Sequence, residues 1–179
     1  MVKATKLPTT LILALDPATY TTGYAILNYD PNKKEKYVEL IKFGYFDIPK
    51  GLGYGHRMHL LREKVLLLLK MSKAKQMIIE KPFLGPNPNT FMLLSGGYGI
   101  LTGIAYEKGV PIIAIPPSDA KVLFCGTSRM KGKESKKKIR KILESLYEVT
   151  FTKDDESDAV ATGITGVEKY LAQGIDTHY

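Results

Sequence analysis

Apolar residues along this chain fall into short runs and helix-spaced stripes that alternate with polar turns. The run Leu11–Leu15 is nearly unbroken, which is typical of a strand covered on both faces. Two more strands are predicted at Gly23–Tyr29 and at Tyr37–Ile48, the latter rich in Val, Ile, Phe and Tyr. Because the links between them are short, these three strands should form an antiparallel meander.

Helical and strand patterns alternate in the rest of the chain. This order is typical of βαβ units, in which the strands are parallel and the crossovers right-handed. The sequence therefore predicts an α/β fold with a five-stranded mixed sheet, three antiparallel strands and then two parallel ones, flanked by helices. The expected elements are a helix at His56–Ser72, a strand at Gln76–Glu80, a helix at Thr90–Lys108, a strand at Val110–Ile115, and helices at 118–124 (with Ser118 as N-cap), 134–147 and 154–171.

Length and composition are those of one ordinary globular domain. The 179 residues (1–179) show no linker or repeat, and 44% are hydrophobic and 25% charged. No apolar run reaches the roughly 18 residues of a membrane span, and no signal-peptide pattern opens the chain, which starts with a short basic leader at residues 1–8. The single cysteine, Cys125, can form no internal disulfide. We therefore expect a cytoplasmic protein with no membrane partner.

Net positive charge points to a polyanionic partner. Lys and Arg number 26 against 18 Asp and Glu, a net charge of +8, so nucleic acid is the first candidate. One segment concentrates this charge, with only Glu134 to oppose it. Such a run can be merely a solvated helix face, but its density favours contact with phosphates. Its basic residues are Lys131, Lys133, Lys136, Lys137, Lys138, Arg140 and Lys141.

Four acidic residues stand at positions where the predicted elements would converge. Asp16 ends the first strand, Glu80 ends the fourth, and Asp155 and Asp158 lie one turn apart at the start of the last helix. Each has a simple alternative explanation, because Asp is common in turns and acids stabilise helix N-termini. However, if the first and fourth strands are neighbours, Asp16 and Glu80 emerge together at the carboxyl ends of the strands, where α/β sheets build their sites.

Four carboxylates in one pocket need cations to remain ionised. A Cys/His zinc site is not expected, because His56 and His59 have no third ligand nearby and should be solvated or capping. Oxygen ligands alone favour Mg²⁺ or Mn²⁺. Two such ions can bind the attacking water and the leaving oxygen of a phosphoryl displacement.

Two glycine-rich segments have less definite meanings. Gly96, Gly97, Gly99 and Gly103 lie inside a predicted helix, where each costs about 1 kcal/mol relative to Ala. Such a cost indicates close backbone approach, either to the sheet or to a second copy of the helix. Residues 51–55, of sequence GLGYG, are predicted to be a flexible connection.

The order of these acids resembles that of the RuvC-type Holliday-junction resolvases of the RNase H-like superfamily. The resemblance extends from LILALDP, with its TTGYAI return strand, to DESDAVATGI. It implies that Asp16, Glu80, Asp155 and Asp158 are the catalytic metal ligands. It also implies that Phe83, in IIEKPF, stacks on a base at the junction. Lys121 and Lys133 resemble the family's DNA-contacting basic residues, although Lys131 and Lys136 compete with Lys133 for that place.

The resemblance implies a homodimeric, Mg²⁺-dependent endonuclease that resolves four-way DNA junctions by paired nicks, with Mn²⁺ as a substitute. Lys121 would neutralise charge on the transferring phosphate, and DNA would be bound by Lys81, Phe83, Lys121, Lys131, Lys133, Lys136, Lys137 and Arg140. A core anchor is the alternative role for Phe83. Two other functions stay open: a non-catalytic relative that only binds branched nucleic acid, and an actin- or sugar-kinase-like phosphotransferase. The second family needs a second domain and a longer chain than 179 residues.

Overall fold

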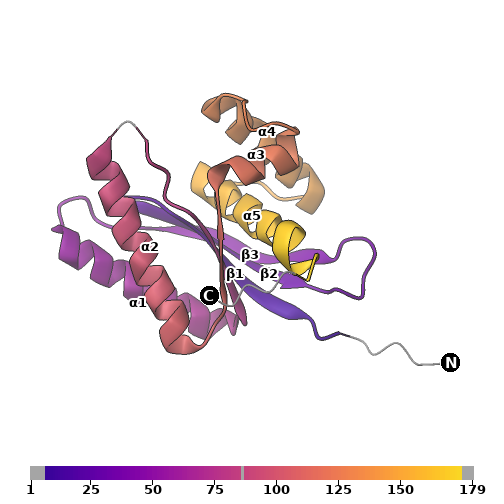
Figure 1. The fold of residues 1–179 in the computed structure, drawn as a ribbon, viewed down its shortest axis with the longest axis horizontal. Helices are drawn as coiled ribbons and strands as arrows, with labels where there is room; N and C mark the ends of the chain where they lie inside the picture. Colours follow the sequence, from indigo (N-terminus) through magenta and orange to yellow (C-terminus); the bar gives the residue numbers. More distant parts are fainter. Residues whose placement is uncertain (1–6, 86, 175–179) are drawn as a thin grey trace.

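The computed structural model describes residues 7–85 and 87–174, so residues 1–6 of the predicted leader lie outside the described part. A central sheet is covered by helices on both faces, as Figure 1 shows. The strands are β1 (Thr10–Pro17), β2 (Thr21–Tyr29), β3 (Val38–Asp47), β4 (Gln76–Glu80) and β5 (Ile112–Ile115). The helices are α1 (Tyr54–Ser72), α2 (Pro88–Lys108), α3 (Pro117–Cys125), α4 (Gly132–Tyr147), α5 (Asp154–Gly166) and the π-helical turn η1 (Val167–Leu171).

The sheet has the predicted mixed topology. Its strand order is β3-β2-β1-β4-β5, with β2 antiparallel to both β1 and β3. Strands β1, β4 and β5 are parallel to one another. Strand β1 is therefore central, and the condition on which the predicted site depended, that β1 and β4 are neighbours, is met.

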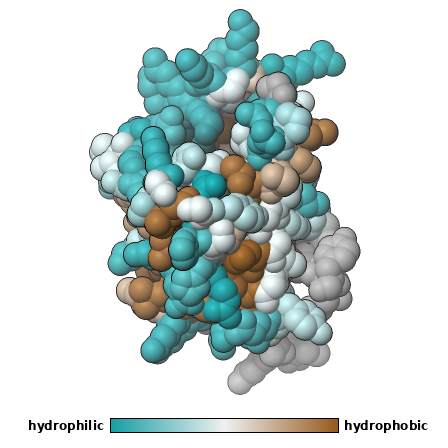
Figure 2. Space-filling model, turned by 90° about the vertical axis from the view of Figure 1, so that its left-hand side faces the viewer, coloured by the Kyte–Doolittle hydropathy of each residue, from teal (hydrophilic) through white to brown (hydrophobic). Residues whose placement is uncertain are grey.

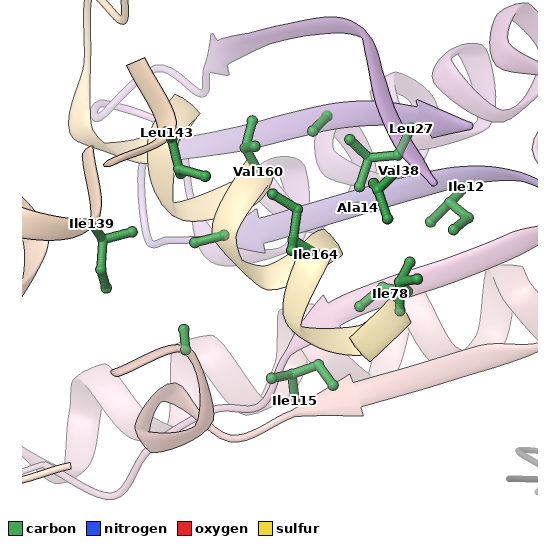
Figure 3. Packing of buried hydrophobic residues seen from close by; sticks show 14 of the residues in the cluster. Ile12, Ala14, Leu27, Val38, Ile78, Ile115, Ile139, Leu143, Val160 and Ile164 are labelled. Atoms are coloured by element: carbon green, nitrogen blue, oxygen red, sulfur yellow. The ribbon is translucent and has the colours of Figure 1, made fainter. Parts of the chain in front are cut away.

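Alternation along β1 explains why helices cover both faces of the sheet. Leu13 and Leu15 belong to the core beneath α1 and α2, whereas Ile12 and Ala14 belong to the core beneath α5. All four side chains are buried. Figure 3 shows this second core, in which Ile164 of α5 lies among side chains of the sheet and α4 contributes further residues.

Helix α5 lies unusually close to the sheet because its inner face carries a glycine. A Cβ atom on Gly163 would lie 2.7 Å from the Cβ of Ala14 in β1 and 2.5 Å from a methyl of Leu27 in β2. Real Cβ atoms do not approach so closely, so only glycine permits this contact. The close packing places the start of α5 directly over the end of β1.

Several details differ from the predictions. Helix α1 begins at Tyr54, within the predicted flexible connection 51–55, and β5 begins at Ile112 rather than Val110. Helix α3 begins with Pro117, and Pro116 rather than Ser118 is its N-cap. Proline suits the first helical position because it needs no hydrogen bond there and its φ is already helical. The predicted last helix ends its α-helical part at Gly166 and continues as η1, where the backbone N–H of Ala172 donates to the carbonyl of Val167, five residues back, at 2.8 Å.

No helix within residues 7–85 and 87–174 has both the length and the apolar character required to cross a bilayer.

Candidate active site

Strands β1 and β4 bring the first two acids together. Leu15 pairs with Ile79 across the two parallel strands, so Asp16 and Glu80 each follow one position later at the same edge. Because side chains alternate between faces, Asp16 follows Ala14, and Glu80 follows Ile78, on the α5 side of the sheet. The two carboxylates therefore share one edge and one face.

The N-terminus of α5 lies over the same edge. Gly23 of β2 pairs with Asp16, and a Cβ atom on Gly23 would lie only 1.9 Å from the carbonyl oxygen of Asp155. A side chain here would push the helix away. The glycine thus allows α5 to bring Asp155 and, one turn later, Asp158 next to Asp16.

The other two acids at the start of α5 have structural partners. The Glu156 side chain is buried and accepts hydrogen bonds from the backbone N–H groups of Thr152 at 2.6 Å and Lys153 at 3.1 Å. Asp154 forms an ion pair with Arg140 of α4 at 3.3 Å. Helix capping and the contact between α4 and α5 therefore account for Glu156 and Asp154, and leave Asp155 and Asp158 for the site.

Mutual repulsion and burial raise the pKa values of the clustered acids. Burial raises the pKa of Asp16 well above its ordinary value, and the negative charges of Glu80 and Asp158 raise it further. Burial, together with the charge of Asp158, raises the pKa of Glu80 to about 7. The pKa of Asp158 is likewise raised, mainly by burial. The negative charges of these carboxylates repel one another, and a cation bound between them would favour their charged forms.

Lys136 of α4 already places a cation among them. Its ammonium donates to the Asp158 carboxylate, and its charge lowers the pKa values of Asp16 and Glu80. Burial by itself would lower the pKa of Lys136, but the attraction of Asp158 raises it overall. Lys121 of α3 is a second, weaker influence that also lowers the pKa of Glu80.

The Lys136 side chain is 52% exposed and its ammonium contacts Asp158 of α5, whereas the sequence favoured contact with phosphates for the whole basic run. In α4 the buried stripe consists of Ser135, Ile139 and Leu143, so Lys136 lies at its border. A long side chain at such a border can bury its stem and direct its charge towards α5. The helical pattern shows only that the residue is next to the stripe, and its partner comes from another element.

Arg140 was also predicted to contact phosphates, but its guanidinium is already bound to groups of the protein. Its guanidinium donates to Glu144 at 3.0 Å and to the carbonyl of Phe151, in addition to its ion pair with Asp154. These bonds hold the end of α4 against the start of α5. In contrast, four other basic residues of the predicted set are exposed and form no ion pair within the described part of the chain, namely Lys81, Lys131, Lys133 and Lys137.

Phe83 lies on the segment between β4 and α2 with 69% of its surface exposed. The neighbouring Leu84 is 64% exposed. An apolar ring so placed contributes little to the core, so the alternative role of core anchor does not match the structure. Figure 2 shows the end of the molecule to which β1, β4 and this segment point, with hydrophilic side chains gathered towards the top, where α3 and α4 lie in Figure 1.

The four acids offer oxygen ligands, the type that a hard divalent cation prefers, although their side chains do not form a closed ligand cage. The described residues contain no group of three or more His, Cys, Asp or Glu side chains arranged to hold a metal ion. All four acids nevertheless offer oxygen ligands, which Mg²⁺ and Mn²⁺ prefer.

A mixed five-stranded sheet with carboxylates at the ends of its central strands and on a helix that crosses them defines an RNase H-like nuclease. The chain belongs to the RuvC family, described as crossover junction endodeoxyribonuclease RuvC, whose family model matches residues 12–166. It is thus an endonuclease that resolves Holliday junctions. Enzymes of this family are nucleases that use divalent metal ions.

Relatives and solved structures agree with this membership. The chain is 27% identical to a crossover junction endodeoxyribonuclease RuvC of Dictyoglomus turgidum over 159 residues, which cover 89% of this chain and 97% of the relative. Its fold is similar to that of T. thermophilus RuvC in complex with a Holliday junction substrate, with a TM-score of 0.76, 17% identity, and coverage of 92% of this chain and 96% of that one. The yeast mitochondrial Holliday junction resolvase Ydc2 has a TM-score of 0.64 at 15% identity, over 90% and 79% of the two chains.

Proposed function

We propose that Asp16, Glu80, Asp155 and Asp158 hold Mg²⁺, for which Mn²⁺ can substitute, and that the protein cuts four-way DNA junctions by paired nicks as a homodimer. The observation that supports this proposal most is electrostatic: half-buried carboxylates from β1, β4 and α5 lie at one edge of the sheet, where burial and mutual repulsion raise the pKa values of Asp16 and Glu80. Such an arrangement destabilises the fold unless it binds cations, and it is therefore expected to have a function.

When bound, the two ions would activate a water molecule and stabilise the negative charge on the leaving oxygen of the cleaved phosphodiester. The chain itself orients the acids. Asp16 and Glu80 are held by the rigid β1–β4 pair, and Asp155 and Asp158 by the closely packed start of α5. Rigid elements keep catalytic groups in place better than loops do.

Two lysines have complementary roles at the reacting phosphate. Lys136 balances the charge of the acids in the absence of metal, and divalent ions would free its ammonium to approach the phosphodiester. Lys121 lies near Glu80, where its charge can offset the charge that develops on the transferring phosphate.

Contacts beyond the site would hold the junction. The exposed Phe83 ring can stack on an unpaired base, a contact worth about 1–3 kcal/mol. Lys81, Lys131, Lys133 and Lys137 can contact phosphates, which would position the DNA without reading its sequence.

The outer face of α2 supports the homodimer. Gly96 allows the Tyr54 ring of α1 to cross the helix, since a Cβ atom there would lie 1.6 Å from the tyrosine oxygen. Cβ atoms on Gly99 and Gly103 would meet nothing within 4 Å. The same helical stripe includes Met92, which is 64% exposed, and Tyr106, which is 89% exposed. This face of small and apolar residues fits a second copy of α2, with two active sites available for the two nicks.

The experiment that tests this function compares three labelled substrates, a four-way junction, a linear duplex and an RNA–DNA hybrid, each with and without Mg²⁺. We expect cuts in the junction, only with the metal, at paired positions on opposite strands. Binding to the junction without cleavage under any metal condition would favour the non-catalytic relative. Transfer of phosphate to a small molecule, with no cut in DNA, would favour the phosphotransferase.

Substitution of Asp16 separates binding from catalysis. Asp16→Asn removes one metal-binding charge and leaves the shape of the strand end intact, so cleavage should fall below detection while junction affinity stays within about threefold of the parent protein. Gel-based cleavage and fluorescence anisotropy measure the two properties. Cleavage at the parent rate would remove Asp16 from the proposed metal site.

With this activity we expect the protein to act in the cytoplasm, where it can reach DNA.

A further inference from the structure

The segment between β3 and the first turn of α1 carries glycines that the fold does not require. Gly51, Gly53 and Gly55 alternate through Lys50–Gly55, and a Cβ atom on any of them would meet nothing within 4 Å. None of the three has a positive φ angle. Since glycine costs conformational entropy on folding and here relieves no clash, its effect is to leave the backbone bare on the outside. A bare backbone allows close approach of a ligand.

The N-terminus of helix α1, at the end of this segment, has neither a side-chain cap nor an acidic residue in its first turn. Its N-cap is Gly53, no side chain caps it, and its first turn contains no acidic residue. The helix has 19 residues, so its N-terminal N–H groups and macrodipole carry a partial positive charge that the described residues do not balance. Glycine-rich segments that lead into helix N-termini are well suited to bind phosphate.

A buried cation lies in the same turn. Arg57 is only 7% exposed, and its Nε atom has no hydrogen-bond partner within the described part of the chain. Its guanidinium makes one long hydrogen bond, 3.4 Å, to the carbonyl of Thr19, and lies 5.0 Å from the centre of the Tyr20 ring. No carboxylate of residues 7–85 and 87–174 forms an ion pair with it. A buried positive charge of this kind attracts an anion from outside.

A second cation flanks the same ring. The ammonium of Lys50 lies 5.7 Å from the centre of the Tyr20 ring, which is itself 37% exposed. Hydrogen bonds from Lys153, at 3.0 Å, and from the hydroxyl of Thr21, at 2.8 Å, lower the pKa of the nearby Asp47, and the charge of Lys50 lowers it further, so Asp47 offsets only part of the positive charge of Lys50. Lys50 and Arg57 thus present positive charge around an aromatic ring.

This cluster lies at the catalytic end of the sheet but on the face opposite to α4. Tyr20 belongs to the turn that follows Asp16 and Pro17, and β3, which precedes the glycine-rich segment, ends beside Thr21. Helix α1 packs on one face of the sheet, whereas α4 and α5 pack on the other, as Figure 1 shows. The cluster and the candidate active site therefore share one end of the sheet.

We propose that the segment Lys50–Gly55, the N-terminus of α1, and the cations Lys50 and Arg57 form a second phosphate-binding site. Its ligand is a backbone phosphodiester of the junction DNA, on the far side of the scissile phosphate from α4. This inference rests on the proposed function, and it assigns a surface outside the metal site and the basic helix. The site binds backbone and reads no base, because all its groups recognise negative charge.

A matched pair of substitutions at Gly53 tests the proposal. Gly53 has φ −60° and ψ 159°, which any residue can adopt, and its missing Cβ points into open space. Asp and Asn are equally good N-caps, and both should maintain or raise the melting temperature. Only Asp adds a negative charge where the phosphate would lie. We expect Gly53→Asp to weaken binding of a labelled four-way junction about tenfold at low salt, and Gly53→Asn to remain within about twofold of the parent.

Salt dependence provides a second measurement. Lys50→Gln should reduce the slope of log affinity against log salt by about 1, as expected for the loss of one phosphate contact. Equal affinity of the Asp and Asn variants, or an unchanged slope for Lys50→Gln, would overturn the second site. If either result is found while the parent protein binds and cuts the junction, the second phosphate-binding site is refuted but the proposed nuclease function is not. If the parent protein does not bind the junction at all, both proposals fail.

Discussion

At the scale of single residues, the site is a balance of charges in a partly buried place. Glu80 has its pKa raised to about 7 by burial and by Asp158, and the pKa of Asp16 is raised for similar reasons. Lys136 relieves part of this repulsion. Of the four acids at the start of α5, the partners of Asp154 and Glu156 show that these two serve the fold.

The raised pKa of Glu80 predicts how the metal-free protein responds to pH. The folded carboxyl binds a proton at about pH 7, whereas the unfolded carboxyl does so only near 4.3. The folded state therefore binds more protons between these values, and stability should rise as the pH is lowered from 8 towards 5. Thermal unfolding in a chelator at pH 8 and pH 5.5 measures the change, which Glu80→Gln should diminish.

A divalent metal ion should restore the stability that the metal-free protein loses as the pH rises. At pH 8 Mg²⁺ should raise the melting temperature of the parent protein, because it binds the folded carboxylates and not the unfolded ones. The control is Glu63→Gln on the exposed face of α1, which should leave both responses unchanged. A melting temperature of the parent protein that is independent of both pH and Mg²⁺ would contradict the proposed carboxylate cluster.

At the scale of elements, α5 and α4 contribute different groups, acidic residues from α5 and basic residues from α4. Helix α5 is tightly packed and carries the proposed metal ligands Asp155 and Asp158, and α4 directs one of its lysines, Lys136, to Asp158. The basic run of α4 is thus not uniform. Lys136 and Arg140 have protein partners, whereas Lys133 and Lys137 form no ion pair with the described residues.

Packing of α5 should control activity as well as stability. Gly163→Ala adds a methyl group that would lie 2.7 Å from the Cβ of Ala14, so the helix must shift. We expect a loss of about 1–3 kcal/mol in the free energy of unfolding, despite the better helix propensity of Ala, and slower cleavage as the acids of α5 move. Gly132→Ala, in α4 with open space around it, is the matched control and should change neither. Denaturant unfolding and cleavage assays measure the two effects, and a Gly163→Ala protein as stable and as active as the parent would contradict the close packing.

The exposed lysines of α4 should determine the salt dependence of binding. The double substitution of Lys133 and Lys137 by Gln should reduce the slope of log affinity against log salt by about 2, because two phosphate contacts are lost. The same change at Lys64 and Lys70, exposed residues of α1, should leave the slope unchanged. Anisotropy titrations of a four-way junction over a range of salt concentrations measure these slopes. Equal slopes for the two double variants would make the run of α4 a solvated face.

At the scale of the whole molecule, the sheet separates two layers with different tasks. The α3–α5 layer carries two of the four proposed metal ligands and the basic residues, and the α1–α2 layer carries the proposed dimer face and the proposed second phosphate site. A junction has two strands to cut, so an assembly with two copies of the site suits it. The proposed face of α2 provides for that assembly.

The dimer face predicts a separation of binding from paired cutting. Gly99→Glu puts a charge in the centre of the exposed stripe of α2, where no atom of the described structure lies within 4 Å of the added Cβ. The fold should survive, the mass measured by sedimentation should fall from dimer to monomer, and paired nicks should become single nicks. Ser145→Glu, at an exposed position of α4, is the control and should remain dimeric. A Gly99→Glu protein with the parent's mass would place the dimer surface elsewhere.

The sequence alone determined the elements and the order of the acids, because both are local or nearly local properties. The apolar run Leu11–Leu15 must be a buried strand, and an acid directly after it must lie at the strand's end. The βαβ alternation then determined which strands are parallel. The predicted sheet is confirmed for these reasons.

Only the tertiary structure decided which acids face one another and which lysine lies among them. Asp154, Asp155, Glu156 and Asp158 are nearly alike in sequence. Glu156 caps its own helix, but Asp154 pairs with Arg140 of α4, and Asp155 and Asp158 lie near Asp16 of β1. The role of Gly23 depends on the backbone of Asp155, more than a hundred residues away. Helical spacing places Lys136 beside a buried stripe, but the charge that attracts it is on α5. Periodicity reports the direction of a side chain from its own element, and a site is made where several elements meet.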